Sequence, residues 1–427
     1  MKKSALSQIV LVLAVLGFAS CNAGVHINTP PSAVYQRVLA SQSASSPAAS
    51  SGLLIINGEI DALARGEISA GTAPGLMAIS PNRATLLSFD SLTNRVDVVN
   101  TTKESLTGSI QLAGPTTSMA IPLPGLGFAA VPATPFVGSS PGAVVEMNLT
   151  SGGITATISV PNAQTVVSNA TGTQLLVFGN DSDAVTVVSP LLVNTGSPVT
   201  VTVPGFDRPV YGFFSGSSVY ILNCGAECGG TQASVQVLNL GTTPPTAGAA
   251  VPVDGATIGY LTGTTLYVAG NSPANSACTG ETTAATTCGR LDFVDLSSMT
   301  VTGSAVITDG YHNRIDMALN GQLFVGSQGC TNEGNVNNPQ GEVRGCLSIY
   351  NTLNASVVIP PDNGDVTGLQ SFSTRDVEYV AEGGNVRVYD TLIDSLLLDN
   401  VNDTNIPETG TVTITGYVID VKAIDFF

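Results

Sequence analysis

Tryptophan is absent from the 427 residues, and basic residues are scarce, with 14 Lys and Arg against 31 Asp and Glu and a net charge of −17. Nucleic-acid binding needs clustered Lys and Arg to meet the phosphates, so this composition argues against a nucleic-acid partner. Charged residues make up only 11% of the chain and aromatic residues 5%, while 43% of the residues are hydrophobic. A chain this apolar is not disordered and can form a large core.

The chain also lacks the common catalytic signatures. It contains no G-x-S-x-G, H-E-x-x-H or phosphate-binding loop, and its two histidines are His26 and His312. No C-x-x-C occurs, so a zinc site is not indicated. Two oxygen-rich runs, Asn180–Asp183 and Asp399–Asp403, could hold Ca²⁺ but lack the spacing of an EF-hand, and such runs are usually turns. The sequence therefore assigns no catalytic residue and no metal ligand, and Ca²⁺ is the one cofactor for which it offers candidates.

The first twenty residues have the pattern of an export signal. Lys2 and Lys3 precede the apolar stretch Ile9–Ala19, which is too short to span a bilayer comfortably. The stretch runs into Phe18-Ala19-Ser20-Cys21, which resembles the lipobox of bacterial lipoproteins, although Phe18 stands where Leu is usual. The resemblance implies cleavage before Cys21 and lipidation of its thiol. An ordinary secreted protein cut near the same place is the alternative.

The resemblance also implies an address and a domain division. Asn22 follows the cysteine where an Asp would favour the inner membrane, so the protein is expected at the outer membrane, facing the periplasm or the cell surface. We expect a signal peptide over residues 1–20, a flexible tether over 21–32 and one β domain over 33–427.

The six remaining cysteines fall into three pairs of near neighbours: Cys224 and Cys228, Cys278 and Cys288, Cys330 and Cys346. Six cysteines allow fifteen connectivities, but each of these pairs lies within one repeat, which favours local pairing. Disulfides fit an oxidising compartment outside the cytoplasm.

A short apolar strand that ends in a polar residue recurs along the chain. Its copies are Leu53–Asn57, Val96–Asn100, Val144–Asn148, Val185–Ser189, Val235–Asn239, Leu291–Asp295, Leu347–Asn351 and Val386–Asp390. The clearest full unit, Gly75–Gly114, has four short strands separated by turn residues. Four-stranded units of about 40–45 residues are typical of propeller blades, and the longer intervals coincide with the cysteine-bearing insertions.

The unit at Gly75–Gly114 resembles the YVTN-type β-propeller repeat of bacterial and archaeal envelope proteins. It shares the turn Ser80-Pro81-Asn82, the strand Asn94–Asn100 and a closing strand with Gly. Elsewhere the pattern is degenerate, and Pro122 and Pro124 disturb one turn. The resemblance implies an all-β propeller over nearly the whole mature chain and implies little about activity.

Eight copies of the recurring strand predict eight blades. The first unit supplies only Val34–Ala40, Leu53–Asn57 and Gly66–Ala70, whereas Asp420–Phe427 is a strand without a unit of its own. We expect this C-terminal strand to become the inner strand of the first blade and to close the ring, which removes an open sheet edge. Seven blades are the alternative, if Ser395–Asp399 and Glu408–Val418 merge with their neighbours differently. An outer-membrane barrel would need longer alternating strands and more aromatic residues.

The candidate ligand face follows from this topology. In a four-stranded blade, the connections from strand two to three and from strand four to the next blade emerge on the same side. That side receives all three cysteine pairs and two blade-to-blade connections, which carry Asp207 and Arg208 and, further on, Asp309, Tyr311, His312 and Arg314. Insertions on a rigid scaffold are where binding sites are commonly built, although a lone His is more often structural.

Three functions are compatible with these observations. The favoured one is a lipid-anchored propeller that binds a protein, a glycan or a small ligand at the cell envelope. An enzyme of lactonase or lyase type with its site on the disulfide-bearing face, and a component of a surface layer or adhesion apparatus, are the alternatives.

Overall fold

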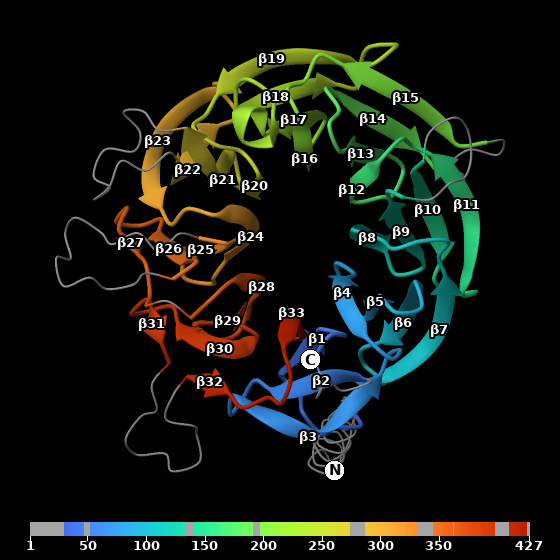
Figure 1. Cartoon of the computed structure of the whole chain (residues 1–427), viewed down its shortest axis with the longest axis vertical. Coiled ribbons are helices and arrows are strands. Elements are labelled where there is room, and N and C mark those ends of the chain that lie inside the picture. Colours follow the sequence, from blue (N-terminus) through green and yellow to red (C-terminus); the bar gives the residue numbers. More distant parts are fainter. Residues whose placement is uncertain are drawn as a thin grey trace, which may run out of the picture.

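The structure, a computed structural model, describes residues 30–46, 52–133, 141–190, 197–273, 287–330, 345–361, 363–397 and 410–424. They form eight antiparallel sheets set like blades around a central axis (Figure 1), so the chain is an eight-bladed β-propeller, as the strand count predicts. The seven-bladed alternative is wrong. Within these ranges the one helical element is the 3-10 turn η1 (Gly225–Cys228). No helix in the described part is long and apolar enough to cross a membrane.

Blades two to four follow the chain directly, with the first strand next to the axis and the fourth at the rim. Their strands are β4 (Pro74–Ile79), β5 (Thr85–Asp90), β6 (Arg95–Asn100), β7 (Ser105–Gln111); β8 (Ser118–Leu123), β9 (Leu126–Val131), β10 (Ala143–Asn148), β11 (Gly153–Ser159); β12 (Ala163–Ser168), β13 (Leu175–Gly179), β14 (Ala184–Ser189), β15 (Val199–Pro204).

Blades five to eight repeat the arrangement, and β32 adds a further short strand to the last blade by pairing with β30. Their strands are β16 (Pro209–Ser215), β17 (Ser218–Asn223), β18 (Ser234–Asn239), β19 (Thr246–Pro252); β20 (Ile258–Thr262), β21 (Thr265–Pro273), β22 (Thr287–Asp295), β23 (Thr300–Ile307); β24 (Tyr311–Met317), β25 (Gln322–Gln328), β26 (Leu347–Asn351), β27 (Val357–Val358); β28 (Val366–Ser371), β29 (Val377–Glu382), β30 (Asn385–Asp390), β31 (Ser395–Leu396), β32 (Thr411–Val412).

Blade one is built from both ends of the chain. From the axis outward it consists of β33 (Val418–Ile424), β1 (Arg37–Gln42), β2 (Gly52–Asn57) and β3 (Ala62–Ser69). β33 runs antiparallel to β1, with Ile424 opposite Arg37 (Figure 1). The predicted closure of the ring by the C-terminal strand is therefore confirmed, although β1 and β3 begin at other residues than the sequence suggested.

The core lies between neighbouring blades. The apolar residues of the inner three strands point alternately to the two faces of each sheet and pack against the next blade. At the junction of blades eight and one, Val38, Tyr379 and Val421 are fully buried in one such cluster. Burying a side chain of this size is worth about 1.5–3 kcal/mol, so each junction contributes to a ring that only full closure completes.

A polar residue recurs inside the third strand and fixes the connection that leads into its blade. Gln236 donates to the carbonyl of Gly205 at 3.1 Å, Asp292 accepts from the amide of Asp254 at 2.6 Å, and Ser348 accepts from the amide of Thr308 at 3.0 Å. These connections run from the outer strand of one blade to the inner strand of the next. These bonds fix the backbone of the connections at one end of the ring.

The two faces of the ring carry different connections. One face carries the second-to-third and the blade-to-blade connections, and we call it the stapled face. The other face carries the first-to-second and third-to-fourth turns, and we call it the turn face. Cys224–Cys228 and Cys330–Cys346 are bonded within second-to-third connections of the stapled face, as predicted. Cys288 is disulfide-bonded at the start of β22, and Cys278 lies outside the described residues.

Candidate functional site

A cavity of about 420 Å³ opens at the axis on the stapled face. Its wall comes mainly from the beginnings of the inner strands of blades two to seven, each of which enters the channel from this face. Each of these blades contributes at least one lining residue: Leu76, Ser118, Thr165, Tyr211, Ile258 and Arg314. A volume of this size is ordinary for a small-molecule site.

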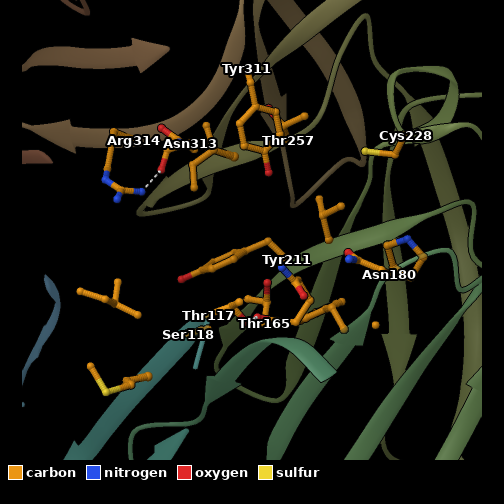
Figure 2. Close-up of a pocket in the computed structure, with 18 residues that line it drawn as sticks. Thr117, Ser118, Thr165, Asn180, Tyr211, Cys228, Thr257, Tyr311, Asn313 and Arg314 are labelled. Atoms are coloured by element: carbon orange, nitrogen blue, oxygen red, sulfur yellow. Dashed lines mark hydrogen bonds between the residues drawn. The ribbon is translucent and has the colours of Figure 1, made fainter. Parts of the chain in front are cut away.

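Among the described residues, Arg314, on β24, is the one positively charged side chain that lines this cavity. Its Nε donates to the carbonyl of Thr367 at 2.5 Å and its Nη1 to the carbonyl of Asn313 at 2.9 Å (Figure 2). No carboxylate of the described residues lies within 4.0 Å of this guanidinium, whereas six other arginines form such pairs: Arg37, Arg95, Arg208, Arg290, Arg375 and Arg387. Arg314 is thus held by neutral oxygens, which leave its charge uncompensated.

Two tyrosines flank the same space. Tyr211 of β16 and Tyr311 of β24 lie on either side of the cavity in Figure 2, with Arg314 near Tyr311. Burial raises the pKa of Tyr211. Burial and the nearby Glu227 carboxylate raise the pKa of Tyr311, and Arg314 opposes this only in part. Both phenols therefore keep their protons at neutral pH and can donate hydrogen bonds.

Hydroxyl and amide groups of blades three and four line the part of the wall that lies away from Arg314. The Thr117 hydroxyl donates to the carbonyl of Gln164 at 2.6 Å, and Ser118 Oγ accepts from the amide of Val166 at 3.2 Å, so both tie blade three to blade four. The side chains of Thr165 and Asn180 also line the cavity (Figure 2) and make no hydrogen bond to other described residues. They are free to bind a polar ligand.

The first disulfide shapes the edge of the cavity. Cys228, at the end of η1, lines it, and Glu227 beside it accepts hydrogen bonds from the amide and Nδ2 of Asn271, at 2.8 and 3.0 Å. Gly225 starts this turn with φ +60, and a Cβ there would come within 2.2 Å of the amide of Ala233. The stapled loop of blade five is therefore compact and anchored on blade six.

His312 does not face the cavity, and its expected position beside the stapled loops must be corrected. The segment belongs to the inner strand β24, and the His312 side chain is fully buried on the other side of that strand. Its Nε2 bonds the carbonyl of Thr308 at 2.8 Å, and its backbone carbonyl accepts from the Thr257 hydroxyl at 2.8 Å. Burial lowers its pKa to about 4, so His312 is neutral and structural.

Of the other candidate residues, Asp207 and Arg208 organise loops around the cavity. The Asp207 carboxylate accepts hydrogen bonds from the amides of Thr231 and Gln232, at 3.0 and 2.7 Å. Burial acts to raise the pKa of Asp207, but the hydrogen bonds outweigh it and the pKa is lowered. Arg208 lies 3.6 Å from Asp181. Asp309 accepts a hydrogen bond from Ser327 through its backbone carbonyl. The structure thus brings only Tyr311 and Arg314, of the six, to the cavity wall.

The first candidate Ca²⁺ run, Asn180–Asp183, is a turn that faces an arginine. Asp181 and Asp183 are exposed and face Arg208, at 3.6 and 3.8 Å, which makes this run a turn paired with a cation. Asp399–Asp403 lies outside the described residues. In the described part of the chain, no group of three or more His, Cys, Asp or Glu is arranged to hold a metal ion.

Tyr211, Ser118 and Thr165 were not predicted as site residues, and Asn180 was named only as part of a candidate Ca²⁺ run. They come from blades far apart in sequence, and only the ring places them together. One signal was available, because the segments Thr116-Thr117-Ser118 and Gln164-Thr165 begin inner strands with polar residues where the neighbouring strands are apolar.

No protein-family profile and no curated protein sequence matches the chain. Among solved structures, it is similar to the dihydro-heme d1 dehydrogenase NirN in complex with DHE, with 10% identity and a TM-score of 0.61 over 92% of this chain and 75% of that one. It is similar to the C-terminal WD40 domain of Sif2, with 11% identity and a TM-score of 0.53 over 81% and 90% of the chains. A weaker match, with 12% identity and a TM-score of 0.48 over 91% and 99%, is the periplasmic gluconolactonase PpgL of Pseudomonas aeruginosa.

These identities show a shared fold alone. In all, 1153 solved chains match, and a fold this widespread hosts many unrelated activities.

Proposed function

We propose that the protein is a binding protein of the cell envelope, and that its ligand is a small polar molecule with a carboxylate or similar anionic group. The observation that carries this proposal is Arg314, a guanidinium at the cavity wall without a carboxylate partner among the described residues, in a chain with a net charge of −17. Arginine binds carboxylates through paired N–H groups, and a buried or half-buried arginine without an anion is costly.

The rest of the cavity supports a ligand that also carries hydroxyl groups. Tyr211 and Tyr311 offer phenolic donors and apolar ring faces, and Thr165 and Asn180 offer a hydroxyl and an amide. Aromatic surface combined with a few convergent polar groups is common in sites for small organic ligands, sugar acids among them.

We also propose the address that the N-terminal sequence suggests. Lipidation of Cys21 would anchor the protein, through the tether 21–32, to the outer membrane. We propose as well that the chain is related to the YVTN-type propellers. No set of residues in the cavity supports the lactonase or lyase alternative or the surface-layer alternative. Both stay predictions.

The proposal is tested by screening small mono- and dicarboxylates, including sugar acids, for a rise in melting temperature and then measuring Kd by calorimetry. Arg314→Gln is expected to weaken a hit by about 10- to 100-fold, because a hydrogen bond to a charged group is worth about 1.5–3 kcal/mol. Tyr211→Phe should weaken it less.

Arg208→Gln is the matched control, since Arg208 lies on the same face but is paired with Asp181 outside the cavity. A carboxylate that binds Arg314→Gln as tightly as the parent protein, or a screen in which only cations and uncharged molecules bind, would count against the proposed ligand class.

A further inference from the structure

Exposed apolar side chains are distributed unevenly between the two faces of the ring. The described residues include fifteen large apolar side chains that are exposed. Six of them lie at the turn face, Leu123 at the end of β8 and the others in turns: Ile60, Leu319, Leu353, Leu392 and Ile393. Five more lie at the first or second position of outer strands that start from that face, and four are on the stapled side. Scattered exposed leucines are normal, whereas apolar side chains that gather on one face are typical of contact surfaces.

The most exposed of the turn-face side chains lie on blades seven and eight. Leu353 is 82% exposed, Ile393 67%, Leu392 66% and Leu319 59%. The turns that carry them are connected, because Asn320 Nδ2 donates to the carbonyl of Thr391 at 2.7 Å and so joins the turn after β24 to the turn after β30. The side chains are thus presented together from fixed turns and are not isolated.

The N-terminal segment reaches the ring at the same face. The amide of Ser32 donates to Glu104 Oε2 at 2.6 Å, and Glu104 lies in the turn between β6 and β7, a third-to-fourth turn. Arg37, the first residue of β1, also bonds Glu104, at 2.7 Å. Residues 1–29, with the proposed lipid attachment at Cys21, therefore precede a segment that is fixed to the turn face.

From these two observations we infer that the turn face rests on a lipid bilayer. In this arrangement Leu319, Leu353, Leu392 and Ile393 enter the interface between headgroups and acyl chains. The inference rests on the proposed anchor for its biological setting, but the surface itself is a property of the folded ring. Apolar side chains that project from a rigid face bind a bilayer interface, and a lipid attached at Cys21 would hold this face against the bilayer, so the two contacts would act together.

The net charge of −17 means that anionic lipids would repel the ring, so the contact relies on apolar side chains and suits zwitterionic lipid. This orientation has a direct effect on the proposed site. The stapled face, with Arg314 and the cavity, points away from the membrane toward solvent.

The absence of Trp permits a clean test with single-tryptophan reporters. The test uses a chain that starts at Asn22, which keeps every described residue. An N-terminal histidine tag attaches this chain to phosphatidylcholine vesicles that contain a nickel-chelating lipid. The vesicles also contain a lipid with brominated acyl chains, which quenches tryptophan that enters the bilayer. Leu353→Trp is expected to show a blue-shifted emission and strong quenching. Leu92→Trp, placed at a side chain of 66% exposure on the stapled face, is the matched control and should show neither.

A second variant tests the patch and not merely the tether. Replacing Leu319, Leu392 and Ile393 by Ser in the Leu353→Trp protein should lower the quenching several-fold and should weaken binding of the untagged chain to vesicles at least tenfold. Equal quenching of the two reporters, or quenching that the Ser variant leaves unchanged, would overturn the inference. So would a dimer in solution that the Ser variant dissociates, since the patch would then belong to a second copy.

This experiment does not require lipidation or a known ligand. If Cys21 proves unlipidated by mass spectrometry, or if no carboxylate binds, the proposed function fails while the reporter result stands.

Discussion

The carboxyl groups of Glu378 and Asp316 interact across the junction of blades eight and seven. The Glu378 side chain is fully buried. If it were ionised, neither of its carboxylate oxygens would accept a hydrogen bond from a described residue. Its contact with Asp316, which accepts from the amide of Ser371 at 2.7 Å, forms a bond only if a proton lies between the two carboxyl groups. Burial and the Asp316 charge accordingly hold the pKa of Glu378 well above its usual value.

This pair predicts a loss of stability on the alkaline side. Because the folded state keeps a proton that the unfolded state releases at ordinary carboxyl pKa, stability is complete below that value and falls as pH rises through the raised pKa. Glu378→Gln, whose amide donates to Asp316 without titrating, should flatten the pH dependence of the melting temperature above pH 5. If parent and variant lose stability in parallel between pH 5 and 9, the shared proton is not present.

His312 predicts the opposite behaviour on the acid side. Burial lowers its pKa from 6.5 to about 4, so the unfolded state binds a proton that the folded state refuses between these values. Stability is therefore complete above pH 6.5 and falls by about 3 kcal/mol as pH drops through the folded pKa. Urea unfolding of the parent and of His312→Gln at pH 7 and pH 4 measures this; a difference between the two proteins that does not change with pH contradicts it.

Removal of the closing strand should destabilise the whole ring. A chain that ends at Ile419 loses most of β33, which leaves the edge of β1 unpaired and removes Val421 and Ala423 from the core between blades eight and one. We expect loss of the cooperative melting transition and aggregation on gel filtration. Deletion of residues 425–427 alone keeps β33 and is the control; a chain ending at Ile419 that melts like the full chain would show that the ring closes without this strand.

A second connection across the same junction is the pair of Asp61 and Arg375. Two N–H···O contacts of 2.9 Å join them, and the hydroxyl of Tyr379 donates to the same carboxylate. Asp61 is buried, so Asp61→Asn should cost about 3–5 kcal/mol in chemical denaturation. The exposed pair of Asp181 and Arg208 provides the contrast, and Asp181→Asn should cost less than about 1 kcal/mol. Similar costs for both variants would mean that Asp61 does not stabilise the closed ring.

The architecture could be predicted from sequence because its signal is repeated. Val96–Asn100 is a short apolar strand like many others, but its eight copies give the number of blades, and each copy is the third strand of its sheet. Counting strands also left one C-terminal strand without a blade, which predicted that it closes the ring. The local disulfides followed too, since each described pair lies within one insertion.

The site could be predicted only in part, because proximity around the axis leaves no trace in sequence spacing. Tyr211 and Arg314 line one cavity from blades five and seven, and no local pattern connects them. His312 was misplaced for a different reason. The strand begins one residue before it, and in a strand neighbouring side chains point to opposite faces, so Tyr311 reaches the cavity wall while His312 enters the core.

The partnership of β33 with β1 imposes an order of events on the folding chain. The innermost strand of the first blade is synthesised after all other described strands of the ring, so blade one stays incomplete until the other seven blades have been made. A contact between residues so distant in sequence forms slowly, and the partly built ring exposes the edge of β1 in the meantime. The growing chain therefore has to be protected from premature association until β33 has been made.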